Sequence, residues 1–335
     1  MNIVTLTDQE REAARAARVT GVFCRLTHTS ILEVRGADTA RYLEAMCTKD
    51  LSGLDPGGLR YSALLDDRGR LVADFWIWRA GESWWLEVED AAAEPLLERL
   101  NRFAVADEVE VVWRDDLVLV HAEGPRAGPV VSVFLDDDLT PEAAGATVRR
   151  YVMGWARRSR FGEEGFTLAC ASSAPSGWVA VRSAGLVEAS AAVQESLRIE
   201  AGRARFGIDF SDHDLLPEVG IWGALSLDKG CFPGQEIVRR VISRGEVKRR
   251  LVGFVEDASV PGAPVLEATS ITESVALGRR VGLGWLKTSE ARPEARVSVQ
   301  GPLFGGQVAA LPFVSGPHAA APDVPGERVE NTASR

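Results

Sequence analysis

The order of apolar and polar stretches along the chain constrains its fold more than any other sequence feature. Residues 26–34 alternate as a strand does, residues 38–47 carry apolar side chains at helical spacing, and several more strand-like stretches follow. A parallel sheet would need a helix between successive strands, and that regular alternation is missing here. The sequence therefore predicts an α+β fold.

A hairpin is the clearest local prediction. Residues 60–65 and 70–78 read as two strands joined by a turn at Asp66–Gly69. Residues 122–148 show little pattern and are expected to include solvated loop, and residues 151–182 predict further strands. The remaining expected elements are helices at 8–18, 91–103, 189–201 (stopped by Gly202) and 235–242, and strands at 83–88, 109–113 and 117–121.

The pattern of apolar and turn-forming residues changes after Gly245. Short apolar stretches at 251–255, 281–286 and 297–299 alternate with Gly and Pro, which predicts a small all-β domain or barrel. The last twenty residues are rich in Pro and poor in apolar side chains, so we expect a disordered tail. The predicted domains are thus residues 1–245, residues 246–315 and the tail at 316–335.

Composition narrows the function classes. The 335 residues include 38 basic and 48 acidic side chains, a formal net charge of −10. Nucleic acid and anionic lipid would repel such a surface, so we expect no direct DNA binding and no membrane association. The cysteines, Cys24, Cys47, Cys170 and Cys231, form no CxxC pair, which predicts no metal site and favours a reducing compartment. Without a signal peptide or a span of about 18 apolar residues, we expect a cytoplasmic protein.

The segment 229–236, with the sequence KGCFPGQE, is the most unusual in the chain. Pro233–Gly234 suits a type II turn with Gly234 at positive φ, and Gln235 and Glu236 would open the next helix. Lys229 and the helix N-terminus would both stabilise a Cys231 thiolate, which indicates a reactive or ligand-contacting cysteine. The alternative, which composition alone favours, is a small buried cysteine in a structural turn.

Two carboxylates stand in unusual places. Glu200 falls in the last turn of the 189–201 helix, where it opposes the helix dipole; it could serve a ligand or pair with Arg203. Asp74 falls inside an apolar strand, where a charge needs a partner or a purpose unless it faces solvent.

A basic run lies within the acidic chain. Its members are Arg239, Arg240, Arg244, Lys248, Arg249 and Arg250. It could meet an anionic ligand tail, RNA or an acidic partner, or it could be a solvated helix face followed by a linker.

Taken together, these segments resemble a known family. The stretch 229–236 resembles the K-G-C-[FY]-x-G-Q-E signature of YgfZ proteins, which are folate-binding relatives of the glycine cleavage T-protein. Supporting likeness is found in 32–38, in the 66–69 turn, in 198–209 and in 276–284, so it covers about residues 20 to 300. Mitochondrial members of that family assist iron–sulfur cluster assembly.

The resemblance implies a multi-lobed ring of α+β lobes around a central folate channel, with a C-terminal β-barrel. Residues 1–245 would form two intertwined folate-binding lobes, and tetrahydrofolate would be the cofactor. It implies that Glu200 accepts the row of pterin N–H donors and that Asp74 and Cys231 are catalytic. The other residues assigned to the cofactor are Lys229, Gly230, Gly234, Gln235, Glu236 and, for the anionic glutamate tail, Arg239.

The resemblance further implies an accessory factor that supports assembly, maintenance or repair of iron–sulfur proteins, including tRNA-modifying enzymes, with those proteins or their assembly machinery as partners. T-proteins carry paired acids where this chain reads Ala73–Asp74, which favours a role other than enzyme. One alternative is a folate-dependent aminomethyltransferase or demethylase in which Asp74 acts on the amine. The other is a binding module that kept the fold without the ligand.

Overall fold

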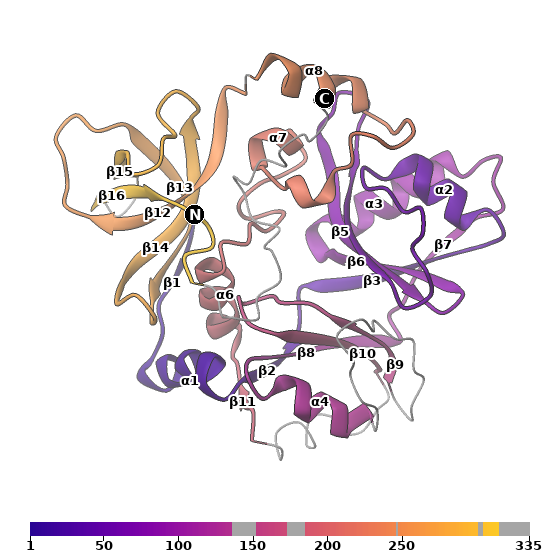
Figure 1. Cartoon of the computed structure of the whole chain (residues 1–335), viewed down its shortest axis with the longest axis horizontal. Helices are drawn as coiled ribbons and strands as arrows, with labels where there is room; N and C mark the ends of the chain where they lie inside the picture. The colour runs from indigo at the N-terminus through magenta and orange to yellow at the C-terminus, as the bar shows by residue number, and fades with distance from the viewer. Residues whose placement is uncertain (136–151, 173–184, 246, 301–303, 315–335) are drawn as a thin grey trace, which may run out of the picture.

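The computed structural model describes residues 1–135, 152–172, 185–245, 247–300 and 304–314. Within these residues the strands form three sheets, which lie around a middle region that holds α6 (Ala191–Glu200) (Figure 1). Each sheet is built mainly of antiparallel pairs and helices pack against them, so the predicted α+β class agrees with the mixed content of the chain.

The first sheet has the order β4-β5-β6-β3-β7 and is antiparallel throughout. Its predicted hairpin is confirmed, and α3 packs on it because an apolar stripe that includes Leu96 and Leu100 faces the sheet. The elements are β3 (Thr29–Arg35), α2 (Thr39–Met46), β4 (Leu59–Leu65), β5 (Leu71–Ala80), β6 (Ser83–Glu89), α3 (Asp90–Phe103) and β7 (Glu110–Trp113).

The second sheet has the order β11-β2-β8-β10-β9, and α4 packs on β8 and β10. Here one expectation is wrong. The strand expected at 26–34 is two strands, because β2 pairs with β8 while β3 pairs with β6 of the first sheet. The segment 122–148, which was expected to include solvated loop, contains the end of β8 and α4, and its residues 136–148 lie outside the described residues. The elements are β2 (Val22–Leu26), β8 (Leu117–Glu123), α4 (Ala127–Leu135), β9 (Val152–Arg157), β10 (Gly165–Ala171) and β11 (Val187–Glu188).

The third sheet closes on itself as a five-stranded barrel, because β13 pairs with both β14 and β15. The expected barrel is therefore present, although β13 and β16 were not expected from the sequence. A further strand, β1, comes from the N-terminus and pairs in parallel with β13. The elements are β1 (Asn2–Val4), β12 (Arg249–Asp257), β13 (Val265–Ser274), β14 (Arg279–Lys287), β15 (Arg296–Val299) and β16 (Phe304–Ala309). The tail expected at 316–335 lies outside the described residues.

The remaining helices connect the sheets. α1 (Asp8–Val19) begins at a capping box of Thr7 and Glu10 and packs on α6. α6 starts at the Ser190 cap and ends at Gly202, whose φ of 66° makes it the predicted stop. α7 (Leu216–Val219) and α8 (Gln235–Arg244) follow, and Gly234 before α8 has the predicted positive φ of 76°.

Lys229 ties the loop before α8 to the end of α2. Its buried Nζ donates to the carbonyl oxygens of Glu44 at 2.6 Å, Cys47 at 2.8 Å and Lys49 at 2.9 Å. It also lies 3.1 Å from the Glu44 carboxylate. An ammonium group suits this place because helix carbonyls lack intrahelical partners at the C-terminal end.

We expect Lys229→Met to lower the free energy of unfolding by about 2–4 kcal/mol, because three buried carbonyls would lose their donor. Urea titration of the variant and the wild type measures this. The matched control is Lys248→Met, since Lys248 is exposed and should tolerate the same change. Equal losses in both variants would contradict the role of Lys229 in the joint.

Candidate functional site

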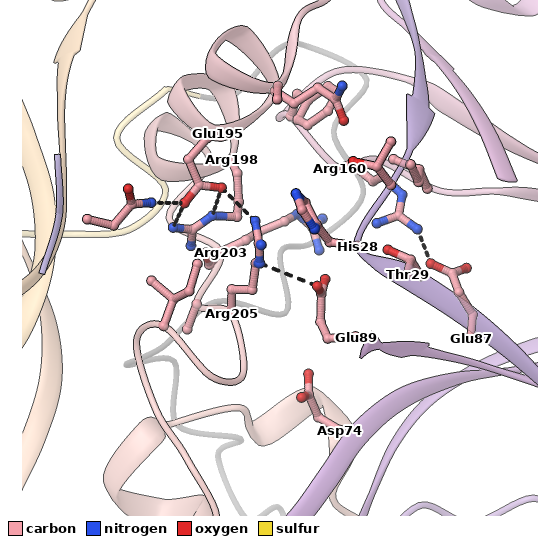
Figure 2. Close-up of a pocket in the computed structure, with 18 of the residues that line it drawn as sticks. His28, Thr29, Asp74, Glu87, Glu89, Arg160, Glu195, Arg198, Arg203 and Arg205 are labelled. Atoms are coloured by element: carbon pink, nitrogen blue, oxygen red, sulfur yellow. Dashed lines mark hydrogen bonds and ion pairs between the residues drawn. The ribbon is translucent and has the colours of Figure 1, made fainter. Parts of the chain in front are cut away.

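A cavity of about 560 Å³ lies where the three sheets and α6 meet. β5 and β6 contribute from the first sheet, the segment 158–161 from the second, β1 from the barrel sheet, and residues 203–208 follow α6. Figure 2 shows charged side chains reaching it from β5, β6, the segment 158–161, α6 and the segment 203–208. Its size is that of a typical small-molecule site.

Asp74 of β5 is one of the acids that line this cavity. Its Oδ2 accepts a hydrogen bond from the Tyr61 hydroxyl at 2.7 Å, while its buried Oδ1 has no partner among the described residues. Tyr61 is itself held by stacking on Trp76, with ring centroids 5.1 Å apart. Burial raises the pKa of Asp74 to about 6. Asp74 therefore lines a cavity and does not lie on the outer surface of the sheet.

Glu89 is a second acid in the same cavity, at the end of β6 (Figure 2). Burial raises the pKa of Glu89 to about 7, with the charge of Asp74 acting in the same direction and Arg205 against it. Arg205 Nε lies 3.3 Å from the Glu89 carboxylate. The cavity thus contains two carboxyl groups that titrate near neutral pH, a property found often at functional sites.

Arg198 of α6 connects the segments that form one wall of the cavity. Its guanidinium donates to Glu195 and to Asp209, each at 2.7 Å, and to Ser270 Oγ of the barrel at 2.9 Å. Burial disfavours the charge, but Asp209 and Glu195 outweigh it and raise the pKa of Arg198. Asp209 also accepts from the hydroxyls of Thr269 and Ser270, each at 2.6 Å. One buried ion pair therefore connects α6, the loop after it and the barrel.

Glu87 of β6 lies at another wall of the cavity. Its Oε1 accepts from Arg158 and from Arg160, and its Oε2 accepts from Trp78 Nε1 at 3.1 Å. The Arg158 guanidinium also lies over the Trp76 ring, 4.4 Å from its centroid. Two cations thus share one buried carboxylate beside the cavity.

The loop that carries these arginines is folded around the carboxylate of Glu123. This fully buried group accepts from His121 Nε2 at 2.7 Å, from Ser159 Oγ at 3.1 Å, and from the backbone N–H groups of Arg160, Phe161 and Glu163 at 2.6–2.8 Å. Burial opposes ionisation, but these donors, His121 first, outweigh it and lower the pKa of Glu123. Burial also lowers the pKa of His121, which favours a neutral ring.

The Glu200 side chain lies away from the residues that line the cavity. Its carboxylate accepts from Arg18 at 2.9 Å and from Ser274 Oγ at 2.6 Å, so it joins α1 to β13 and does not pair with Arg203. The pterin-binding role assigned to it stays a prediction.

The residues of the 229–236 signature lie outside the cavity lining as well. Cys231 is exposed, which differs from the alternative of a buried structural cysteine. Gly234 packs on the β4–β5 turn, where an added Cβ would lie 2.5 Å from the Asp66 carbonyl. Glu236 pairs with Arg240 at 2.6 Å, the Gln235 amide donates to the Gly230 carbonyl at 3.3 Å, and Arg239 donates to the Leu227 carbonyl. Their catalytic and cofactor-binding roles remain predictions.

Sequence reasoning missed several charged residues of the cavity. Glu89 closes the strand expected at 83–88, and Arg203 and Arg205 directly follow the Gly202 stop. Glu195 and Arg198 share α6 with Glu200, but three residues apart they lie on one face, which faces the cavity. A search for charges on one face of the 189–201 helix could have found this pair.

Comparison with known proteins identifies the family. The model of the GCVT N-terminal domain matches residues 5–229. This chain belongs to that family. An aminomethyltransferase of Rubrobacter xylanophilus is 30% identical over 294 residues, covering 83% of this chain and 78% of that protein. An aminomethyltransferase of Bacillus velezensis is 28% identical, with 92% and 90% covered.

The fold is also known from crystal structures. The glycine cleavage system aminomethyltransferase T of Bartonella henselae superposes with a TM-score of 0.81 at 20% identity, covering 93% of this chain and 91% of that one. The expected T-protein-like fold is confirmed by this similarity. Aminomethyltransferases of this family use tetrahydrofolate, so the cofactor expected from the sequence is the one the family uses.

The main functional expectation is wrong. An accessory factor for iron–sulfur proteins was expected, but the relatives across most of the chain are aminomethyltransferases. The 229–236 signature is a short local feature, whereas the aminomethyltransferases match this chain over most of its length. In the described part of the chain, no helix has the length and apolar character needed to cross a membrane.

We expect Glu123→Gln to destabilise the protein by roughly 2–4 kcal/mol, because either orientation of the amide turns an N–H₂ group toward a backbone N–H donor. Unfolding in urea at pH 7.5 measures this. The control Glu98→Gln makes the same change at an exposed helix position and should be neutral. A Glu123→Gln protein as stable as this control would show that the loop does not depend on the carboxylate.

Proposed function

We propose that this protein is a tetrahydrofolate-dependent aminomethyltransferase, which moves a one-carbon unit from an aminomethyl donor to tetrahydrofolate. The observation that supports this most is Asp74, an acid in a cavity of about 560 Å³ with one oxygen that has no partner among the described residues. The names of the relatives give the reaction class. The folate-binding region is proposed to be residues 1–245.

The residues of the cavity fit a folate. The pterin ring presents a row of N–H donors, and the Glu89 carboxyl in the cavity offers acceptors for such a row. Tyr61 and Trp76, stacked on each other beside Asp74, add aromatic surface for a flat ring. When bound, tetrahydrofolate would supply the nitrogen atoms that take up the one-carbon unit.

Asp74 would hold the amine of the donor and move its proton. Its Oδ2 is fixed by Tyr61, so Oδ1 has a set direction for an N–H group of the ligand. With a pKa of about 6, the carboxylate is ionised at pH 7.5 and still basic enough to accept a proton. Ammonia and the donor without its aminomethyl carbon would be the other products.

We expect Asp74→Asn to lower methylene-tetrahydrofolate formation by at least about 100-fold, since the amide keeps the shape but not the charge. The same variant should unfold at an equal or higher temperature at pH 8. The folded-state pKa of Asp74 is raised above its ordinary value of 3.8, so ionisation costs the fold stability as the pH rises through this interval. The exposed Asp115→Asn serves as control. Full activity in Asp74→Asn would overturn the proposal.

The pH dependence of kcat/KM should follow the ionisation of Asp74. We expect the rate to fall about tenfold per pH unit below pH 6 and to level off above it. Glu89 titrates near pH 7, so the profile of Glu89→Gln separates the two groups. A rising limb that persists in Glu89→Gln assigns it to Asp74, and loss of that limb would assign it to Glu89.

The catalytic role predicted for Cys231 can be tested in the same assay. A folded Cys231→Ala protein with strongly reduced transfer would support that role. Unchanged transfer would show that the exposed thiol takes no part in this reaction.

A further inference from the structure

The arginines of the cavity are not all neutralised. Five arginines line it in the described part of the chain, together with four carboxylates, Asp74, Glu87, Glu89 and Glu195. Arg158 and Arg160 share Glu87, Arg198 pairs with Glu195, and Arg205 bridges Glu195 at 3.0 Å and Glu89 at 3.3 Å. Arg203 has no carboxylate partner among the described residues.

Arg203 is placed at the cavity by its backbone. It follows Gly202, which ends α6 at positive φ, and its N–H donates to the Arg198 carbonyl at 3.1 Å while its own carbonyl accepts from the Arg198 guanidinium. The Nε of its guanidinium is buried without a hydrogen-bond partner in the described structure. In Figure 2 no dashed line reaches this side chain, while Arg198 and Arg205 beside it are both paired. A half-buried guanidinium without an anion is costly.

A second arginine, Arg160, lies near Arg203. Burial lowers the pKa of Arg160, and the positive charge of Arg203 acts in the same direction, so the two guanidinium groups lie within reach of each other's field. Arg160 must share the Glu87 carboxylate with Arg158. Arg198 is held by Asp209 as well as by Glu195, so Arg203 is the cavity arginine without a carboxylate partner among the described residues, and its charge suits a singly charged anion.

We propose that Arg203, assisted by Arg160, forms a carboxylate-binding subsite of the cavity. This proposal rests on the proposed function, because the carboxylate belongs to one of the two compounds that bind for the transfer reaction. A guanidinium with free N–H groups matches a carboxylate in geometry and charge. The carboxylate could be that of the folate's glutamate or one carried by the amine donor. Asp74, whose Oδ1 has no partner in the described part of the chain, would then hold the amine of that donor.

The first arm of the test concerns the folate. Binding of tetrahydrofolate and of tetrahydropteroate, which lacks the glutamate, is followed by tryptophan fluorescence in the wild type and in Arg203→Met. If the subsite takes the glutamate, Arg203→Met weakens tetrahydrofolate about tenfold or more and leaves tetrahydropteroate unchanged.

The second arm concerns the donor. A series of ω-amino acids of two to five carbons is compared with alkylamines of equal length, with tetrahydropteroate present. If the subsite takes a donor carboxylate, at least one amino acid binds about tenfold tighter than its alkylamine, and Arg203→Met removes this preference.

Three controls make the outcomes decisive. Arg203→Lys keeps the charge and should retain part of either preference, Arg244→Met removes an exposed arginine and should change neither, and melting temperatures verify folding. A carboxylate preference in neither arm, or one that Arg203→Met leaves intact, overturns the subsite. Wild-type protein that forms methylene-tetrahydrofolate without any such preference would keep the proposed function and lose only the subsite. Protein that binds neither folate would overturn the proposed function, while the amine series, repeated without folate, would still test the subsite.

Discussion

The buried ion pair between Arg198 and Asp209 is the interaction on which the arrangement of the cavity depends. Arg198 comes from α6 and Asp209 from the loop after it, and both bond to Ser270 of the barrel. Isolated charges in such a place would be strongly unfavourable, so each fixes the position of the other. Glu195 also accepts from Arg198 and Arg205, so the Arg198–Asp209 pair fixes the position of this wall of the cavity.

On the opposite side of the cavity the central buried group is a carboxylate. There a single carboxylate, Glu123, collects the N–H groups of a tight loop, and the loop presents Arg158 and Arg160 to Glu87. Both walls therefore use buried charges that pair with charged groups from other segments of the chain. Asp74 and Arg203 line the same cavity, and each keeps one polar atom without a partner in the described structure. A buried polar atom that faces a cavity without a protein partner is a place where a ligand can bind.

Local patterns in the sequence predicted local structure well. The hairpin at Asp66–Gly69, the stop at Gly202 and the positive φ at Gly234 each follow from a few neighbouring residues. The assignment of strands to sheets did not follow, since nothing between residues 26 and 34 shows that the chain leaves one sheet for another. Asp74 was singled out because a charge in an apolar strand is visible locally. Glu89 and Arg203 matter only through neighbours distant in sequence, so spacing could not reveal them.

The short strand β1 has a consequence for how the protein is made. Asn2 pairs with Ser270, so β1 is synthesised long before the strand that it pairs with. Until β13 has been synthesised, β1 has no sheet to join. This sheet thus depends on a contact between segments that lie far apart in the sequence. A fragment that starts at β12 would carry all five strands of the closed barrel and would lack only β1, the further strand that pairs with β13.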